Sequence, residues 1–566
     1  MNTRCRRLLF GLTLCVAAAG SGTRETVAGE QTGARKEKGR AAADNISGRE
    51  LFLREWIAND PRSHGGDGLG PVFNDTSCVS CHNQGGVGGG GPEAKNVMVI
   101  TAFLAAPSPV NAQPFPKRAE TLKQPADVAP ELEKKQAELD RQKREREELL
   151  KELRNLHPGL AVARSVVLHR SGTDPSYAAW RDRVLNFGNI FQNHVFQSVE
   201  AENDGAGTES SGFFGGLLQQ VQRQKEMELR PPAELQAEKV RGIAAIFAAV
   251  AFRGQAANGQ RLVAIPSQRN ATALFGAGLI DAVPDKVLEA AAKQQHPDFP
   301  EISGRVARLK DGKIGRFGWK SQTASLYDFT MTACAVELGL NVPDHAQAGN
   351  PQTPDYRPAG FDLDQDECMA LVKFLKDLPA PEQRDLELPG VADEINGGNK
   401  LFAKIGCAAC HQADLGEARG IYSDLLLHDM GPENADSGSY GVFQPQSPGD
   451  DADDPLSGLV AETPEMPFQS IFQPGAKQGV VEEKIPEKMI GAGRQEWRTP
   501  PLWGVRDSAP YLHDGRAKSL EQAIAFHGGE GQLAANRFFR LKAEERAQLL
   551  TFLRSLVAPG SEVAAK

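Results

Sequence analysis

The chain has 566 residues, of which 40% are hydrophobic and 24% are charged. This composition is typical of a folded globular protein, and the length allows more than one hydrophobic core. The formal net charge is −9, from 64 basic and 73 acidic residues. The sequence therefore lacks the basic excess of an extended nucleic-acid interface, and we expect no nucleic-acid partner.

The N-terminus has the layout of a secretory signal peptide. Three arginines within the first seven residues precede an apolar stretch at residues 8–19 and a run of small residues. The stretch is too short to cross a bilayer. We therefore predict a signal peptide within residues 1–29, a periplasmic or otherwise exported protein, and no transmembrane segment once the signal is removed. A lipoprotein anchor on Cys15 is the alternative, but Leu14 is bulkier than such a site prefers.

The motif C-x-x-C-H occurs twice, as CVSCH at residues 78–82 and as CAACH at residues 407–411. It is the attachment signature of c-type haem, which is joined to its protein outside the cytoplasm. Two thiols at this spacing can add to the two vinyl groups of one porphyrin, and the next histidine can bind the iron. The sequence therefore predicts two covalently bound haem c groups. The predicted attachment residues are Cys78, Cys81, Cys407 and Cys410, and the predicted proximal iron ligands are His82 and His411.

The two motifs lie in two similar stretches of sequence. GRELF at residues 48–52 and GGNKLF at residues 397–402 precede the motifs, and ALVKFLKDLPAP at 370–381 resembles QLLTFLRSLVAP at 548–559. In both closing segments Leu and Phe recur at helical spacing before a proline. Such a terminal helix covers the haem in small cytochromes c.

We therefore expect a mainly α fold with two cytochrome c-like haem domains in tandem, at residues 47–380 and 390–560. The first domain is enlarged by insertions, which include a charged helix at residues 131–154. Its balanced charges favour a solvated helix laced with ion pairs over a docking arm. A second insertion around residues 429–458 contains a cluster of four aspartates, Asp450, Asp451, Asp453 and Asp454, a candidate calcium site that is more simply a solvated acidic loop.

Three further segments narrow the family: SLYDFTMTACAVELGL at 325–340, LLLHDMG at 425–431 and WRTPPLWGVRDSAPYLHDGRAKSLEQAI at 497–524. Together with the haem motifs they resemble the dihaem oxidoreductases of the peroxidase type, also called thiol oxidoreductases. That family is related to bacterial dihaem cytochrome c peroxidases and to the dihaem enzymes that mature methylamine dehydrogenase.

The resemblance implies that the two haems have different roles. A small donor, a cytochrome c or a copper protein, would pass electrons to a haem that has two axial ligands, and peroxide would be reduced at the other haem. Two alternatives stay open. The protein could be a non-enzymatic dihaem electron carrier, or it could use a high-valent haem to oxidise a protein or an organic substrate.

The sequence indicates the second axial ligand of each predicted haem less clearly than the proximal histidine. Met430, 19 residues after His411, is the first choice for the second haem. Its alternatives are Met466, Met489 and His428. The candidates for the first haem are His64, His169, His194 and Met98, and no spacing selects a distal catalytic acid.

A few other residues are singled out by type. Trp319, Trp497 and Trp503 are candidates for packing against or between the haems. His513 and Asp514 lie in a predicted turn, PYLHDG, where they could bond locally or to a haem propionate. Cys334 and Cys368 either form a disulfide or are buried as small hydrophobic residues.

Overall fold

The computed structural model describes residues 46–105, some positions within 137–163, and residues 165–186, 254–255, 261–384, 389–436, 438, 440 and 491–559. These residues all lie in one compact unit that begins at Ile46. The predicted signal peptide, His194, Met466, Met489 and the four aspartates of the acidic loop lie outside the described residues. Within the described part, no helix is both long enough and apolar enough to span a bilayer.

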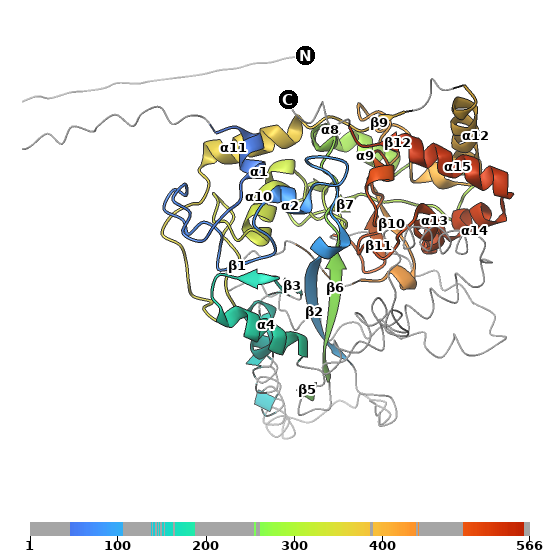
Figure 1. Cartoon of the computed structure of the whole chain (residues 1–566). Helices are drawn as coiled ribbons and strands as arrows, with labels where there is room; N and C mark the ends of the chain where they lie inside the picture. Colours follow the sequence, from blue (N-terminus) through green and yellow to red (C-terminus); the bar gives the residue numbers. More distant parts are fainter. Residues whose placement is uncertain are drawn as a thin grey trace, which may run out of the picture. The chain divides into compact units, whose positions relative to one another are not determined.

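Helices contribute more residues than strands to the described structure (Figure 1). They are α1 (Gly48–Leu53), α2 (Cys78–Cys81), α4 (Ser176–Asn186), α8 (Ala277–Ala282), α9 (Asp285–Ala291), α10 (Leu326–Glu337), α11 (Gln365–Lys376), α12 (Val391–Lys404), α13 (Leu520–Ala525), α14 (Gln532–Arg540) and α15 (Ala543–Ser555). The short strands are β1 (Val72–Phe73), β3 (Ser165–Val167), β4 (Ser171–Gly172), β5 (Gly254–Gln255), β7 (Ala307–Arg308), β8 (Ile314–Gly315), β9 (Glu382–Gln383), β10 (Leu427–Asp429), β11 (Glu496–Arg498) and β12 (Leu556–Val557).

Two long strands, β2 (Val97–Ala105) and β6 (Arg261–Arg269), form an antiparallel pair that the sequence did not predict. They pair along their whole length, from Val97 opposite Arg269 to Ala105 opposite Arg261, in a sheet of order β3-β2-β6-β5. Figure 1 shows the two strands side by side. The mainly helical expectation is thus correct only in part, because the enlarged first half also contains this sheet.

The described positions between 137 and 156 are helical, as the sequence predicted for the charged segment. Leu153 and Leu156 are nevertheless buried with Ile100 and Val166 of β2 and β3 in a separate small core. The helix is therefore anchored by its apolar side, in addition to exposing its charged side.

The predicted lead-in and closing segments form two equivalent helix pairs, α1 with α11 and α12 with α15 (Figure 1). In each pair, a phenylalanine of the first helix contacts a phenylalanine of the second and lies near the histidine of the adjoining C-x-x-C-H motif. Ring centroids are 5.4 Å apart for Phe52 and Phe374 and 5.3 Å for Phe402 and Phe552. The corresponding distances to the histidines are 6.4 Å for Phe52 and His82 and 6.2 Å for Phe402 and His411.

A glycine permits each of these close helix crossings. A Cβ on Gly48 would lie 1.9 Å from the carbonyl oxygen of Ala370, and one on Gly398 would lie 2.1 Å from that of Gln548. Any larger residue would push the helices apart, since these are contacts with backbone atoms. The similarity that the sequence predicted between the two stretches is thus a similarity of packing.

Two large cores accompany the helix pairs. One draws most of its side chains from residues 51–378, and the other draws its side chains from residues 395–556. The first core also contains Leu415, Ile421 and Trp503 from the second half, so buried contacts join the two halves. Cys334 of α10 and Cys368 of α11 are buried in the first core as free thiols, which agrees with the second of the two interpretations given above.

Candidate haem sites

The first motif begins on α2, a single helical turn that closes when the His82 backbone N–H donates to the Cys78 carbonyl at 3.0 Å. The Nδ1 of His82 lies 3.2 Å from the carbonyl oxygen of Gly89. A glycine is required there because an added Cβ would lie 1.7 Å from the Gln84 carbonyl oxygen. When Nδ1–H donates to this carbonyl, Nε2 carries the lone pair that can bind a metal.

The second motif repeats this arrangement. The His411 backbone N–H donates to the Cys407 carbonyl at 3.0 Å, and Nδ1 of His411 lies 2.9 Å from the carbonyl oxygen of Tyr422. Burial lowers the pKa of His411 to about 4 and lowers the pKa of His82 as well. Both imidazoles are therefore neutral at physiological pH, which is the form that ligates metals.

The four motif cysteines are not arranged as reactive thiols. Burial raises the pKa of Cys78, Cys81 and Cys407 to about 12 and also raises that of Cys410. A redox-active dithiol needs the opposite shift, produced by a positively charged neighbourhood. A zinc site is disfavoured too, because in the described residues neither motif brings its cysteines and histidine together as a metal-binding cluster.

Each motif instead faces its own cavity. Cys78, Cys81 and His82 line a cavity of about 1030 Å³, and the second motif lines one of about 2100 Å³. Two thiols and a neutral imidazole on the wall of a large apolar cavity are the donor set that a covalent haem requires.

A buried cation in the second cavity supports the same interpretation. Arg498 is 5% exposed and donates from Nε to the Gly318 carbonyl at 2.8 Å, whereas its Nη1 is buried with no partner in the described residues. Burial lowers its pKa only to about 10, so the guanidinium stays charged. An unpaired buried charge is costly, and a haem propionate in this cavity would neutralise it.

The two cavities share a wall. The shared residues come from the segment that follows β6, from the loop before α10 and from α10 itself: Asn270, Ala271, Thr272, Leu274, Gly318, Trp319 and Phe329. Trp319 donates from Nε1 to the Asn270 carbonyl at 2.9 Å, which fixes its indole in this wall. Of the three predicted tryptophans, Trp497 and Trp503 line only the second cavity.

The second cavity contains Met430, the predicted second ligand, and also His527, which the sequence analysis missed. The Nδ1 of His527 bonds to the Ala523 carbonyl at 2.8 Å, one turn back in the chain. The ring centroids of His527 and His411 are 6.4 Å apart. Two metal–imidazole bonds of about 2 Å, plus roughly 1 Å from each nitrogen to its ring centre, span about this distance.

His428, the alternative to Met430 in the sequence analysis, contacts two carboxylates. Its Nε2 lies 2.9 Å from Asp424 and its Nδ1 lies 2.7 Å from Glu530, both within the buried surroundings of β10. Both ring nitrogens thus bond to carboxylates, although His428 also lines the second cavity and its Nδ1 lies 3.6 Å from Sγ of Cys410.

The described candidates for a second ligand of the first haem do not line the first cavity. His64 bonds to Glu367, and His169 is buried with Nε2 2.8 Å from the Val336 carbonyl. Met98 lies on β2 and packs against the small core beside the sheet. In the described residues, the first cavity has no methionine and no histidine besides His82.

The first cavity instead holds an acid that no sequence spacing selected. Glu337, the last residue of α10, accepts hydrogen bonds from the Tyr440 hydroxyl and, at 2.8 Å, from the Asn74 amide. Both Glu337 and Tyr440 line the cavity, and burial raises the pKa of Glu337. A carboxyl with a raised pKa next to a reaction site is suited to general acid catalysis.

The predicted PYLHDG turn lies against the second cavity, and its histidine has local partners. His513 stacks on Trp497 with ring centroids 3.7 Å apart, and its Nε2 lies 3.5 Å from Asp436 and 3.8 Å from Asp514. The local alternative for His513 and Asp514 therefore has direct contacts to support it.

Comparison with known proteins gives the same class that the geometry defines. Residues 443–556 match the family model described as "Di-haem oxidoreductase, putative peroxidase". These residues hold part of the second motif's cavity wall, including Arg498 and His527.

Three characterised proteins are similar to part of the chain. Hydrazine synthase subunit gamma of Kuenenia stuttgartiensis is 29% identical over 28% of this chain and 40% of its own length. Cytochrome-c peroxidase IdrP1 of Denitromonas iodatirespirans is 27% identical over 29% of this chain and 40% of its own length. Methylamine utilization protein MauG of Methylorubrum extorquens is 25% identical over 30% of this chain and 35% of its own length. A solved MauG-like protein associated with microbial copper homeostasis is 17% identical over 50% of this chain and 92% of that one, with a TM-score of 0.25.

Part of the chain is therefore similar to the dihaem oxidoreductases, the family that its motifs resemble. The match spans less than half the length of each of the three characterised relatives, so its particular activity, substrate and partners are matters for proposal.

Proposed function

We propose that this protein is an exported dihaem c-type oxidoreductase that reduces peroxide with electrons from a small redox protein, a cytochrome c or a copper protein. Two cytochrome c-like domains, at residues 47–380 and 390–560, would each carry one haem. The observation that carries this proposal is the pair of cavities with a common wall. Each cavity presents two cysteines and one neutral histidine, and Trp319 lines both.

The two cavities are lined by different residues away from their C-x-x-C-H motifs. This difference supports distinct roles for the two haems. The second cavity offers His527 and Met430, either of which would give its haem a second axial ligand. Histidine and methionine are the usual second ligands of electron-transferring haems. The first cavity, in the described residues, offers neither, which suits a haem whose open face admits a small substrate. We therefore assign electron entry to the second site and peroxide reduction to the first.

A bound haem supplies the one-electron chemistry that reduces peroxide to water. In this chain, His82 and His411 would hold the two haems through Nε2, and Nη1 of Arg498 would balance the charge of a propionate in the second cavity. Glu337 would deliver a proton from its carboxyl to the leaving oxygen, a role that its place in the cavity wall and its raised pKa support. Trp319, which lines both cavities, would provide an aromatic connection between them.

Spectroscopy of the haem-loaded protein tests this assignment. A pyridine haemochrome spectrum should report two c-type haems per chain. Electron paramagnetic resonance should then show one low-spin haem and one haem that is high-spin, or becomes so on partial reduction. If both haems stay low-spin and peroxide leaves the spectrum unchanged, the electron-carrier alternative is correct. If peroxide oxidises the irons but a donor cytochrome supports no turnover, the oxidation of a protein or organic substrate is favoured.

Variants separate the two candidate ligands and the candidate acid. His527→Ala should convert the second haem to high-spin if His527 is the ligand, and Met430→Ala should lower that haem's midpoint potential if Met430 is. If a variant leaves the spin state and the midpoint potential of the second haem unchanged, the substituted residue is not its second axial ligand. Glu337→Gln should slow peroxide reduction without changing haem content, because the amide keeps its contacts with Tyr440 and Asn74 but cannot donate an acidic proton.

A further inference from the structure

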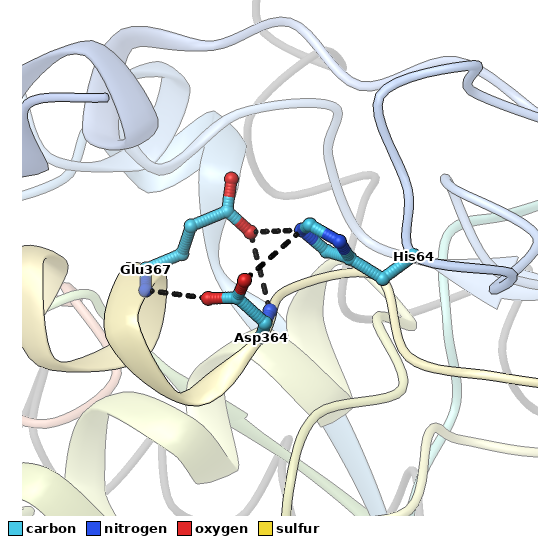
Figure 2. A group of neighbouring side chains, drawn as sticks. All are labelled: His64, Asp364 and Glu367. Carbon is cyan, nitrogen blue, oxygen red and sulfur yellow. Dashed lines mark hydrogen bonds and ion pairs between the residues drawn. The ribbon is translucent and has the colours of Figure 1, made fainter. Parts of the chain in front are cut away.

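A cluster of side chains that could hold a metal ion lies outside both cavities. His64, Asp364 and Glu367 place one ligand atom each within 4.8 Å of the other two. They come from segments 300 residues apart in sequence, the loop before the first motif and the N-terminal turn of α11. In the described residues this is the one group of three or more such side chains that converges in this way. Figure 2 shows the His64 ring directed at the two carboxylates.

The backbone holds the two segments together independently of these side chains. His64 and Gly65 pair with Phe361, and the Gly66 N–H donates to the Phe361 carbonyl at 3.0 Å. Asp362, buried beneath, accepts from the Gly68 N–H at 2.6 Å and from the Asn341 N–H at 2.7 Å. The ligand atoms are therefore preorganised, which is what a metal site on a protein surface requires.

Two carboxylate oxygens of the helix cap are directed at His64: Oδ2 of Asp364, and Oε2 of Glu367, which also accepts from the Asp364 N–H at 3.1 Å. Asp364 caps α11 through Oδ1, which accepts from the Glu367 N–H at 2.9 Å, and its other oxygen, Oδ2, lies 3.7 Å from Nε2 of His64. Glu367 Oε2 lies 2.7 Å from the same nitrogen. Tetrahedral ligands with bonds of 2.0–2.1 Å are separated by about 3.3 Å, a value between these two distances.

We propose that His64, Asp364 and Glu367 bind a divalent transition-metal ion of the Zn²⁺ class. One imidazole nitrogen and two carboxylate oxygens are accepted by Zn²⁺, whereas Ca²⁺ favours six to eight oxygen ligands. The side chains of His64 and Asp364 are 29% and 45% exposed, so water completes the coordination. Arg54 lies near Glu367, and it and the N-terminus of α11 oppose a cation. The two carboxylates together with Asp366 in the same turn outweigh these positive charges.

The ion would clamp the loop before the first C-x-x-C-H motif to α11, the helix that packs against α1. It would lie outside the cavity that holds His82, since none of its three ligands lines that cavity. The site is thus separate from the proposed haem chemistry, and its test does not depend on peroxide reduction.

Calorimetric titration of the full-length, haem-loaded protein with ZnCl₂, after chelation and dialysis, tests the site. Asp364→Asn and Glu367→Gln are the sharpest variants, because Asn is still an N-cap and Gln still completes a capping box, while each removes a charged ligand. His64→Gln removes the imidazole. His296→Gln, a partly exposed histidine away from the cluster, is the matched control.

We expect the wild type and the control to bind one Zn²⁺ per chain at this site, and each ligand variant to bind it at least tenfold more weakly. Zinc should also raise the thermal unfolding midpoint of the wild type but not that of the variants. Equal zinc affinity in the wild type and His64→Gln would overturn the proposal. So would the absence of zinc binding in the wild type, which would leave His64 and Glu367 as an ordinary hydrogen-bonded pair.

Discussion

Two adjacent glycines of α12 give opposite predictions for the same substitution. Replacing a helix glycine by alanine normally stabilises a helix by about 0.5–1 kcal/mol, because alanine loses less backbone entropy. Gly397 should follow this rule: the nearest atom to an added Cβ is Oε1 of the flexible Gln548 side chain, at 3.1 Å. Gly398→Ala should reverse it, because its Cβ would lie 2.1 Å from the Gln548 carbonyl oxygen and 2.8 Å from Cβ of Phe552.

The magnitude follows from what must move. A carbonyl oxygen inside α15 cannot swing away, so reaching a normal contact of about 3.5 Å requires the helices to separate by roughly 1 Å. Overpacking of this kind costs about 1–3 kcal/mol. The free energies of unfolding of Gly397→Ala and Gly398→Ala should therefore differ by about 2 kcal/mol or more, with Gly398→Ala the less stable.

Thermal unfolding of the haem-loaded variants, followed by far-UV circular dichroism and by the Soret band, measures this difference. Gly398→Ala should lower the midpoint by several degrees, whereas Gly397→Ala should hold or raise it. Because Phe402 joins this crossing to His411, the Soret band of the second haem should be perturbed only in Gly398→Ala. If the two variants are equally stable, the crossing is not as close as the packing argument requires.

Other predictions address charge, pH and electron transfer. Asp436→Ala should destabilise the protein by about 3 kcal/mol or more, because it strands the buried Arg269, 2.6 Å away; a double-mutant cycle with Arg269→Met should recover most of the loss. Burial lowers the pKa of His169 to about 4, below the roughly 6.5 of the unfolded chain. The unfolded state therefore takes up this proton first, and the free energy of unfolding should fall from pH 6.5 to pH 4 by up to about 3 kcal/mol. His169→Gln should remove that part of the pH dependence in denaturant titrations. Trp319→Phe should slow electron exchange between the haems in rapid-mixing experiments while haem content stays at two per chain.

Local sequence patterns predicted the parts of the fold that depend on neighbouring residues. The spacing of Leu and Phe in 370–381 and 548–559 was enough to predict α11 and α15, because an amphipathic helix follows from periodicity alone. The pairing of β2 with β6 could not be predicted in this way. The two strands are separated by more than 150 residues, and their register depends on which distant partner covers each apolar face.

The residues of the candidate sites also fall into two groups, those predictable from local spacing and those that depend on tertiary packing. Cysteine and histidine at fixed spacing identify the two motifs, because one turn of backbone brings them together. His527, Arg498 and Glu337 have no such spacing to the motifs and reach the cavities only through tertiary packing. Met430 was found because it lies close to His411 in sequence, whereas the competing His527 lies 116 residues further along the chain.

The contrast between motif residues and residues brought in by tertiary packing suggests how two similar haem sites could have different chemistry. The packing of Phe52, Phe374 and His82 is reproduced by Phe402, Phe552 and His411 to within 0.2 Å in each ring distance. The motif side of each cavity is thus nearly the same, and it cannot distinguish an electron-transferring haem from one open to substrate. The difference must come from the remaining walls, where one cavity presents His527 and Met430 and the other presents Glu337. Exchanging those groups, rather than altering the motifs, is therefore the change that should move the proposed peroxide chemistry from one haem to the other.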